Sequence, residues 1–317
     1  STTGSFNYSW SPDGKWILMS YCARGHYPYD DIGIVSTKGG EPMINLTESG
    51  YTDSAPQWVL DGNAILFASE RYGMRNHASW GTLEDVMIVF LNRKAYDEFK
   101  MTKEERELEK QIAGLHEDKK DDKNNDKKDD KKEDKKENIE DIIVELDDIE
   151  DRIIRLTPSS SDLGSAALSK DGGVLYYQAA YESGMNLWKY DLEKGTPTKI
   201  GSARGRMKWD SKYGTLYVLG GRFSKMKDGG KSLESIAVSS NMVMDLAAER
   251  EYMFNHVYRQ EKERFYNEKM HGVDWEMLTS TYRKFLPHIN NNYDFAELLS
   301  EYLGELNVSH TGSGYRV

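Results

Sequence analysis

A serine and a histidine stand side by side near the end of the sequence, in "GELNVSHTGSGYRV". A serine hydroxyl and an imidazole are the nucleophile and the general base of many hydrolases, and they react only within hydrogen-bond reach of each other. Ser309 and His310 are a poor pair of this kind, because neighbouring side chains diverge on a strand and on a helix alike. If His310 is a base, its nucleophile comes from elsewhere and Ser309 has a supporting role. On the residues alone, a surface or capping role for His310 is the alternative.

Three segments with helical periodicity precede this pair and would position it. An aspartate stands before each, so Asp245, Asp274 and Asp294 are expected to be N-caps. Pro287 should end the second helix, and Glu297 would complete a capping box with Asp294. The expected apolar stripes are Phe254, Tyr258 and Phe265 in the first helix, Trp275, Leu278, Tyr282 and Phe285 in the second, and Phe295, Leu298, Leu299, Tyr302, Leu303 and Leu306 in the third. The sequence therefore predicts a small three-helix cap domain.

The stretch "MHGVDW" between the first two helices also contains a histidine and an acid. His271 and Asp274 could be read as a catalytic dyad. We favour a structural role, in which Gly272 turns the chain, Asp274 caps a helix and Trp275 anchors it.

Four passages in the first two thirds of the chain repeat one pattern. "YSWSPDGKWILMSY" at residues 8–21 and "PQWVLDGNAILFAS" at 56–69 each have an aromatic residue, an Asp-Gly turn and an apolar strand. A third copy begins at Ala167 and a looser fourth at Met207. Asp-Gly closes hairpins, and a period of about forty residues is typical of four-stranded propeller blades. The predicted fold is thus mainly β plus α: about four blades of an incomplete β-propeller in residues 1–238, followed by the helical residues 239–317. Further blades are expected upstream.

A tract of mixed charge interrupts the second of these repeats. Residues 117–138, "EDKKDDKNNDKKDDKKEDKKEN", contain no apolar side chain, so they are expected to be a solvated loop within an insertion near residues 101–140. A docking arm is the alternative. The flanking "TKEERELEKQIAGL" is expected to form a short helix, and "IEDIIVELDDIEDRIIRLT" is expected to resume the blade as strands.

The composition excludes several classes of function. A net charge of −11 without a clustered excess of lysine and arginine argues against a nucleic-acid partner. Cys22 is the single cysteine, so the sequence predicts no intrachain disulfide, and it shows no metal-ligand pattern or phosphate-binding loop. No apolar run is long enough to span a membrane. The opening "STTGSF" lacks an initiator methionine and is expected to follow a lost N-terminal segment, so it says nothing about targeting.

The helical region resembles tricorn-type serine peptidases. The resemblance rests on "NMVMDLAAEREYMFNHVYRQEKERFYNEKMHGVDWEMLTSTYRKFLPHI" and "DFAELLSEYLGELNVSHTG", which cover roughly residues 240–313. It implies that His310 is the general base and that Ser309 helps to position the catalytic groups. It also implies that the nucleophilic serine and a supporting glutamate belong to a later domain, beyond a PDZ-like module. The blades, in turn, resemble those of TolB-type and tricorn-type propellers.

The resemblance therefore predicts part of a serine peptidase whose propeller guides peptides or unfolded polypeptides to the core, with no cofactor. It is compatible with a homo-oligomer, and the chain alone is expected to be inactive. The alternatives are a non-catalytic propeller scaffold that binds a protein or ligand, and a non-peptidase hydrolase, which no residue pattern supports. The compartment stays open between the cytoplasm, where tricorn-type enzymes occur, and the periplasm.

Overall fold

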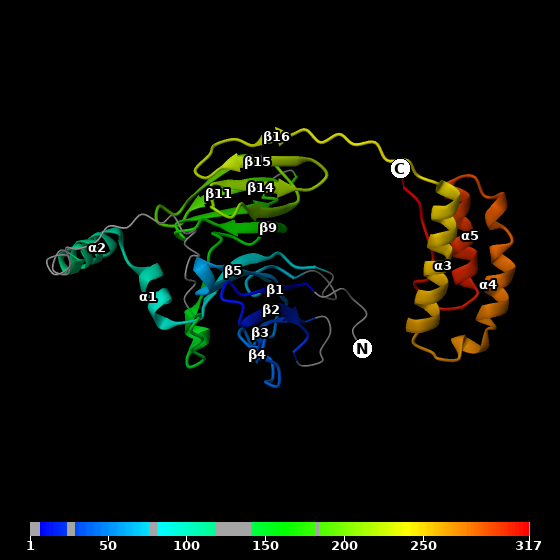
Figure 1. Ribbon diagram of the computed structural model, residues 1–317, viewed down its shortest axis with the longest axis horizontal. Helices are drawn as coiled ribbons and strands as arrows, with labels where there is room; N and C mark the ends of the chain where they lie inside the picture. Colours follow the sequence, from blue (N-terminus) through cyan, green and yellow to red (C-terminus); the bar gives the residue numbers. More distant parts are fainter. Residues whose placement is uncertain (1–6, 24–28, 76–80, 118–140, 182–183, 317) are drawn as a thin grey trace, which may run out of the picture. The chain divides into compact units, whose positions relative to one another are not determined.

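The computed structural model describes residues 7–23, 29–75, 81–117, 141–181 and 184–316. These form two compact units, one of residues 6–238 and one of residues 239–317, which Figure 1 shows as a β unit and a helical unit. Apart from its first residue, the charged tract of residues 117–138 lies outside the described residues.

The β unit consists of four antiparallel sheets of four strands each, in the order of the chain (Figure 1). The first two blades are β1 (Tyr8–Trp10), β2 (Trp16–Tyr21), β3 (Asp31–Ser36) and β4 (Ile44–Asn45), and β5 (Asp53–Val59), β6 (Ala64–Ser69), β7 (Asp85–Phe90) and β8 (Ile153–Arg155). The last two are β9 (Leu163–Leu168), β10 (Val174–Ala179), β11 (Asn186–Asp191) and β12 (Thr196–Ser202), and β13 (Arg206–Trp209), β14 (Thr215–Leu219), β15 (Phe223–Lys227) and β16 (Glu234–Ile236). The predicted propeller blades followed by a helical domain are confirmed.

The repeated "S-x-D-G" sequence builds the same turn in the first and third blades. The Ser11 hydroxyl donates to Asp13 Oδ1 at 2.5 Å and accepts the backbone N–H of Trp16 at 2.9 Å. Ser169 and Asp171 repeat the first of these bonds at 2.6 Å. The glycine that follows each aspartate has a φ of +70° or +75°, which glycine adopts without steric cost. The sequence repeat is therefore also a repeat of local hydrogen bonding.

Two buried aspartates hold the outer parts of the first two blades. Asp31 begins β3 and accepts the side-chain amide of Asn45, on β4, at 2.8 Å. Asp85 begins β7 at the equivalent place, is fully buried, and accepts Arg155 Nε at 2.9 Å and the Thr157 hydroxyl at 2.6 Å. Because a buried carboxylate needs several donors, each aspartate draws the fourth strand and the loop after it into place. Their spacing in the sequence gives no sign of this role.

Apolar clusters between neighbouring sheets form the cores of the β unit, and tryptophan side chains cross from one blade to the next. Trp58 Nε1 donates to the carbonyl of Ser9, and Trp209 Nε1 donates to the carbonyl of Leu168 at 2.7 Å. Each bond joins the first strand of one blade to the first strand of the preceding blade. The aromatic position of the repeat is thus a contact between blades.

The insertion between β7 and β8 contains two helices, α1 (Arg93–Lys100) and α2 (Lys103–Glu117). The helix flanking the charged tract was predicted, whereas α1 was not. Tyr96 and Phe99 of α1 pack on Phe90 at ring-centroid distances of 5.7 and 4.9 Å. The contact of Phe90, at the end of β7, with these two rings of α1 therefore fixes where the insertion leaves the blade.

The segment of residues 139–157 resumes the blade, as predicted, but with one strand rather than several. Among the described residues of this segment only β8 pairs in a sheet, after a short 3₁₀ helix, η4 (Ile149–Arg152). Arg152 is buried and donates to the carbonyls of Phe90, Asp147 and Glu145. The guanidinium of Arg152 occupies backbone carbonyl groups that a second strand would need for hydrogen bonds to a neighbouring strand. The chain therefore folds around the guanidinium and does not extend as a strand.

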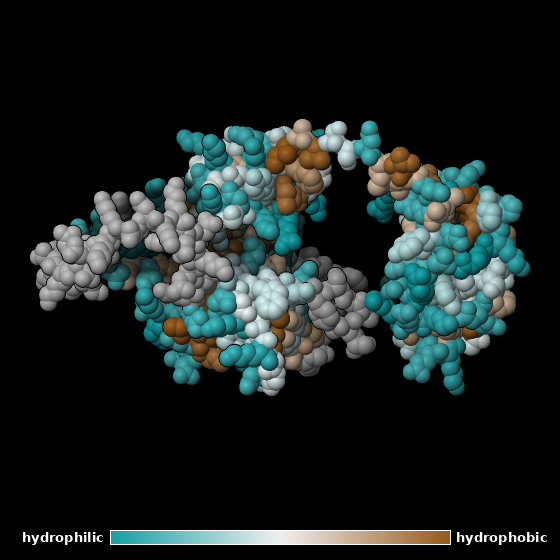
Figure 2. Space-filling view, in the orientation of Figure 1, coloured by the Kyte–Doolittle hydropathy of each residue, from teal (hydrophilic) through white to brown (hydrophobic). Residues whose placement is uncertain are grey.

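The helical unit contains α3 (Leu246–Arg264), α4 (Trp275–Arg283) and α5 (Asn292–Gly304), with 3₁₀ turns η5 (Met270–Gly272) and η6 (Leu286–His288) between them. Its core is a stack of rings in which Tyr302 lies against Trp275 at 4.2 Å and against Phe254 at 5.0 Å. The predicted apolar stripe of α5 is buried throughout. Figure 2 shows mostly hydrophilic side chains on the visible face of this unit.

Two of the three predicted N-caps are confirmed. Asp245 accepts backbone N–H groups of the first turn of α3, and Asp274 does so for α4. The third prediction is wrong, because Asn291 caps α5 and accepts the N–H of Asp294 at 2.9 Å. Asn291 lies three residues earlier and is an equally good cap, so the helix starts there and Glu297 forms no capping box. Phe285 is 53 % exposed, contrary to its predicted place on the buried stripe of α4.

Candidate active site

Ser309 and His310 lie in an exposed turn a few residues after α5 ends at Gly304. Leu306 is fully buried and Val308 packs against the core of the helical unit, so the chain is held up to the residue before the pair. His310 has a left-handed backbone, with φ of +66°. Histidine is among the non-glycine residues enriched in this conformation.

Within the described part of the helical unit, neither the Ser309 hydroxyl nor the His310 ring makes a hydrogen bond. The turn is closed instead by the Thr311 hydroxyl, which donates to the carbonyl of Val308 at 2.9 Å. An exposed imidazole with both nitrogens open can take a proton from a hydroxyl brought to it. The geometry therefore suits a base whose nucleophile arrives from another segment, and it does not bring the two predicted site residues together as a pair.

The other histidine considered from the sequence, His271, has the structural surroundings predicted for it. Gly272 has φ of +81°, Asp274 accepts the N–H of Met277 at 2.9 Å, and Trp275 is 4 % exposed. His271 itself contacts the carbonyl of Leu306, which lies at the end of α5. Sequence reasoning missed this contact, because the two residues are far apart in the chain and only the left-handed turn brings them together.

A tyrosine and a glutamate meet at the same end of α5. The Tyr282 hydroxyl donates to Glu305 Oε1 at 2.8 Å. Burial, followed by the hydrogen bond and the charge of Glu305, raises the pKa of Tyr282 to about 12. Tyr282 therefore stays protonated at neutral pH and remains a donor that holds the Glu305 carboxylate close to the turn.

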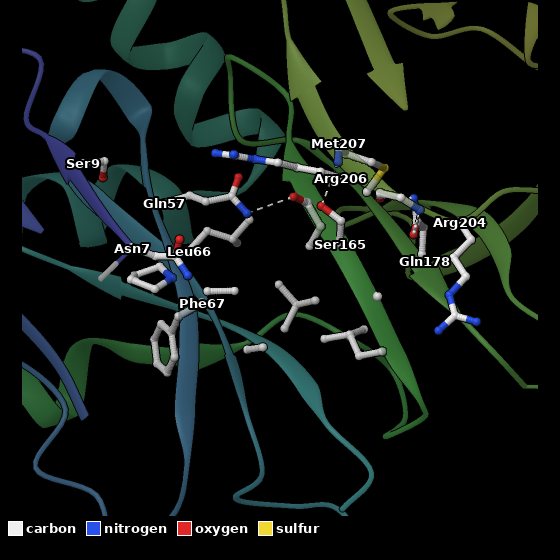
Figure 3. A pocket seen from close by; sticks show the side chains of 18 of the residues that line it. Asn7, Ser9, Gln57, Leu66, Phe67, Ser165, Gln178, Arg204, Arg206 and Met207 are labelled. Atoms are coloured by element: carbon white, nitrogen blue, oxygen red, sulfur yellow. Dashed lines mark hydrogen bonds between the residues drawn. The ribbon is translucent and has the colours of Figure 1, made fainter. Parts of the chain in front are cut away.

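The β unit contains a pocket of about 670 Å³ where the first strands of the four blades converge (Figure 3). Because β1, β5, β9 and β13 or the residues just before them all line it, they are the inner strands of the propeller and the pocket lies along its centre. Its polar and charged lining residues include Asn7, Ser9, Gln57, Ser165, Gln178, Arg204 and Arg206.

Side-chain hydrogen bonds across blades fix the walls of this pocket. Gln57 Nε2 donates to the carbonyl of Ala166 at 3.1 Å, and the Ser165 hydroxyl accepts the N–H of Met207 at 2.9 Å, as Figure 3 shows. Arg204 and Arg206 are exposed. Hydrogen bonds thus join neighbouring blades in the pocket wall, which presents guanidinium groups and hydroxyls that can donate hydrogen bonds.

The described residues contain no cluster of three or more histidine, cysteine or acidic side chains arranged to hold a metal ion. None of the helices among them has the length and apolar character needed to cross a bilayer.

Four-stranded antiparallel blades in chain order, followed by a helical domain, define a protein built of β-propeller blades and a helical domain. Residues 246–304 match the family described as the tricorn protease C1 domain, and these residues span α3 to α5. The helical unit of this chain is therefore similar to the C1 domain of the tricorn protease.

The fold is shared with a solved structure, and two further solved structures are similar over part of the chain. The crystal structure of the tricorn protease matches 97 % of this chain at 13 % identity and a TM-score of 0.65, and the chain spans 29 % of that protein's length. TolB from Acinetobacter baumannii matches 75 % of this chain and 44 % of the TolB chain. The sequence identity is 14 % and the TM-score is 0.42. A puromycin-hydrolyzing peptidase from Mycobacterium tuberculosis matches 78 % of this chain and 31 % of its own chain. The sequence identity is 12 % and the TM-score is 0.43. No curated protein matches the sequence.

Proposed function

We propose that this chain is part of a serine-type peptidase that hydrolyses peptides or unfolded polypeptides, and that His310 is its general base. One observation carries the proposal: the match to the tricorn protease C1 domain ends at residue 304, and His310 follows in an exposed turn supported by a packed helix. The residues before the match form propeller blades, as they do in the tricorn fold.

In this proposal the neutral imidazole of His310 takes the proton of a serine hydroxyl as that oxygen attacks the peptide carbonyl. It then returns the proton to the leaving amine. The serine comes from another part of the longer protein, because the side chains of chain neighbours such as Ser309 and His310 diverge; the Ser309 hydroxyl has an orienting role. Donors for the developing oxyanion come from the same outside segment. Residues 1–317 alone are accordingly inactive towards peptides.

The central pocket of the propeller is proposed to guide substrate. Its position along the inner strands and its polar lining suit an extended polypeptide, whose backbone needs hydrogen-bond partners along its length. The alternative is a propeller that binds a protein or ligand as a scaffold, without catalysis. That alternative is favoured by the absence of a nucleophile beside His310 within the described helical unit.

Single-turnover cleavage of a fluorogenic peptide by the longer protein separates these two functions. We expect His310→Ala to lower the rate by ~10⁴-fold or more, as loss of a triad base does, and Ser309→Ala to cost less. His256→Ala, at an exposed position on α3, is the matched control and should keep the wild-type rate. Circular dichroism checks the fold of each variant. A folded His310→Ala protein with normal turnover would place the scaffold function ahead.

A further inference from the structure

The turn that carries Ser309 and His310 is fastened to the helical unit on both sides. Before the turn, His271 Nδ1 lies 2.9 Å from the carbonyl oxygen of Leu306. After it, the Ser300 hydroxyl accepts the N–H of Ser313 at 2.9 Å and donates to the carbonyl of the same residue at 3.0 Å. The exposed pair therefore lies between two points of attachment rather than on a loose end.

The ring of His271 is held in one orientation and one tautomer. A carbonyl oxygen only accepts, so Nδ1 carries the proton that is donated to Leu306, and in the neutral ring Nε2 accepts the hydroxyl of Tyr266. Phe265 and Tyr266 present their rings to the imidazole at 5.2 Å and at 75° and 76°. Both nitrogens are thus occupied, which leaves His271 unsuited to proton transfer and suited to holding a carbonyl.

The backbone that presents His271 is itself unusual. Met270, His271 and Gly272 have φ values of +49°, +55° and +81° in succession. Left-handed non-glycine residues in a row are costly, and they persist where the surrounding structure stabilises them. Met270 is buried in the core of the helical unit, which supplies part of that stabilisation. The turn so formed places the imidazole beside the end of α5.

The accepting carbonyl is one that the helix cannot satisfy itself. The last helix-like bonds of α5 are those from Leu306 N to Leu303 O and from Asn307 N to Gly304 O, so the carbonyl of Leu306 has no later helical donor. A histidine side chain near a helix C-terminus can cap such a carbonyl by donating a hydrogen bond to it. Losing the contact would remove one hydrogen bond that holds the chain at Leu306, leaving the apolar contacts of Leu306 and Val308 to hold it.

We propose that His271 and Ser300 are positioning residues, which hold the turn bearing His310 at two points so that the base keeps its place for proton transfer. The proposal rests on the proposed function of His310. Proton transfer tolerates small displacements only, and an exposed turn without such contacts would sample many positions.

The first test uses the 317-residue chain and does not depend on activity. Amide hydrogen exchange of residues 307–313 should become about fivefold faster in His271→Phe, which keeps an aromatic ring and loses both nitrogens, and in Ser300→Ala. His271→Asn should restore slow exchange, because its amide can donate to Leu306 and asparagine tolerates a left-handed backbone. The matched controls are His256→Phe on α3 and Ser280→Ala, whose hydroxyl bonds only within its own helix.

The second test measures peptide cleavage by the longer protein with the same variants. We expect His271→Phe and Ser300→Ala to lower kcat about tenfold with KM unchanged, and His271→Asn to recover most of kcat. Unchanged exchange in both variants would overturn the positioning roles whatever the activity. If His310→Ala abolishes cleavage while both variants keep kcat, the positioning roles are wrong and the proposed function stands. If His310→Ala has no effect on peptide cleavage, both the proposed function of His310 and the positioning roles are wrong.

Discussion

The indole nitrogen of Trp209 donates a 2.7 Å hydrogen bond to the backbone carbonyl of Leu168, and this bond joins the fourth blade to the third. The same indole packs edge-on against Tyr176 at 5.5 Å. We predict that Trp209→Phe lowers the free energy of unfolding by about 1–2 kcal/mol, because it removes the donor and part of the ring. Trp10→Phe, at a 58 % exposed position, is the control and should change stability by less than about 0.5 kcal/mol. Urea unfolding followed by fluorescence measures the free energy of unfolding of both variants. Equal losses of stability in the two variants would show that the hydrogen bond from Trp209 contributes nothing.

The core of the helical unit contains a pair of hydroxyls whose removal should not be additive. Thr279 donates to the carbonyl of Trp275, so it accepts the hydroxyl of Tyr302 at 2.6 Å. Thr279→Val leaves the buried Tyr302 hydroxyl without an acceptor and should cost about 1–3 kcal/mol. Adding Tyr302→Phe should restore part of that loss. A double-mutant cycle by thermal unfolding measures the coupling, and strict additivity would contradict it.

Glu84 should make the stability of the β unit depend on pH. Burial, followed by the negative charges of Glu70 and Asp162, raises the pKa of Glu84 from 4.5 to about 7. The folded state therefore binds a proton that the unfolded state has already lost between these values. Stability from this group is present below pH 4.5 and is lost as the pH rises through 7.

Glu84→Gln should consequently stabilise the protein at pH 8, by at most about 3 kcal/mol, and have little effect at pH 4.5. Glu41→Gln, at an exposed position, serves as the control. Urea unfolding at several pH values measures the difference between each variant and wild type. A gain that does not vary with pH would show that charge at Glu84 is not its origin.

Replacing residues 118–138 by a short Gly-Ser linker should shift Tm by no more than about 2 °C. The tract has no apolar side chain with which to contribute to a core, and loop closure changes slowly with length. Differential scanning calorimetry of the shortened and original chains is the measurement. A large loss of Tm would mean that the tract contacts the folded units.

Sequence patterns were most informative where the interactions are local. The turn of Ser11 and Asp13, and the caps made by Asp245 and Asp274, each span two or three residues, so composition and spacing reveal them. The start of α5 was misjudged for a related reason. Asn291 and Asp294 are both competent caps three residues apart, and the choice between them depends on the packing of the whole helix.

Interactions between distant residues could not be read from the sequence. Arg155 donates to Asp85 although the whole insertion separates the two residues in the sequence. Only the folded structure shows that their side chains are neighbours. At the candidate site the resemblance pointed to His310, whereas the contact from His271 to Leu306 depends on a left-handed turn that no residue pattern encodes. The catalytic roles of His310 and Ser309 remain predictions.

The placement of β8 after the insertion has a consequence for synthesis of the protein on the ribosome. β7 ends at Phe90 and its partner β8 begins at Ile153, so residues 91–152 must be made before the second blade can be completed. At roughly 5–20 residues per second this takes about 3–12 seconds, during which the outer edge of β7 has no neighbouring strand. An apolar strand with an open edge invites pairing with other chains. The tract of residues 117–138 is made during that interval and contains no apolar side chain, so it adds no aggregation-prone segment of its own while the blade is incomplete.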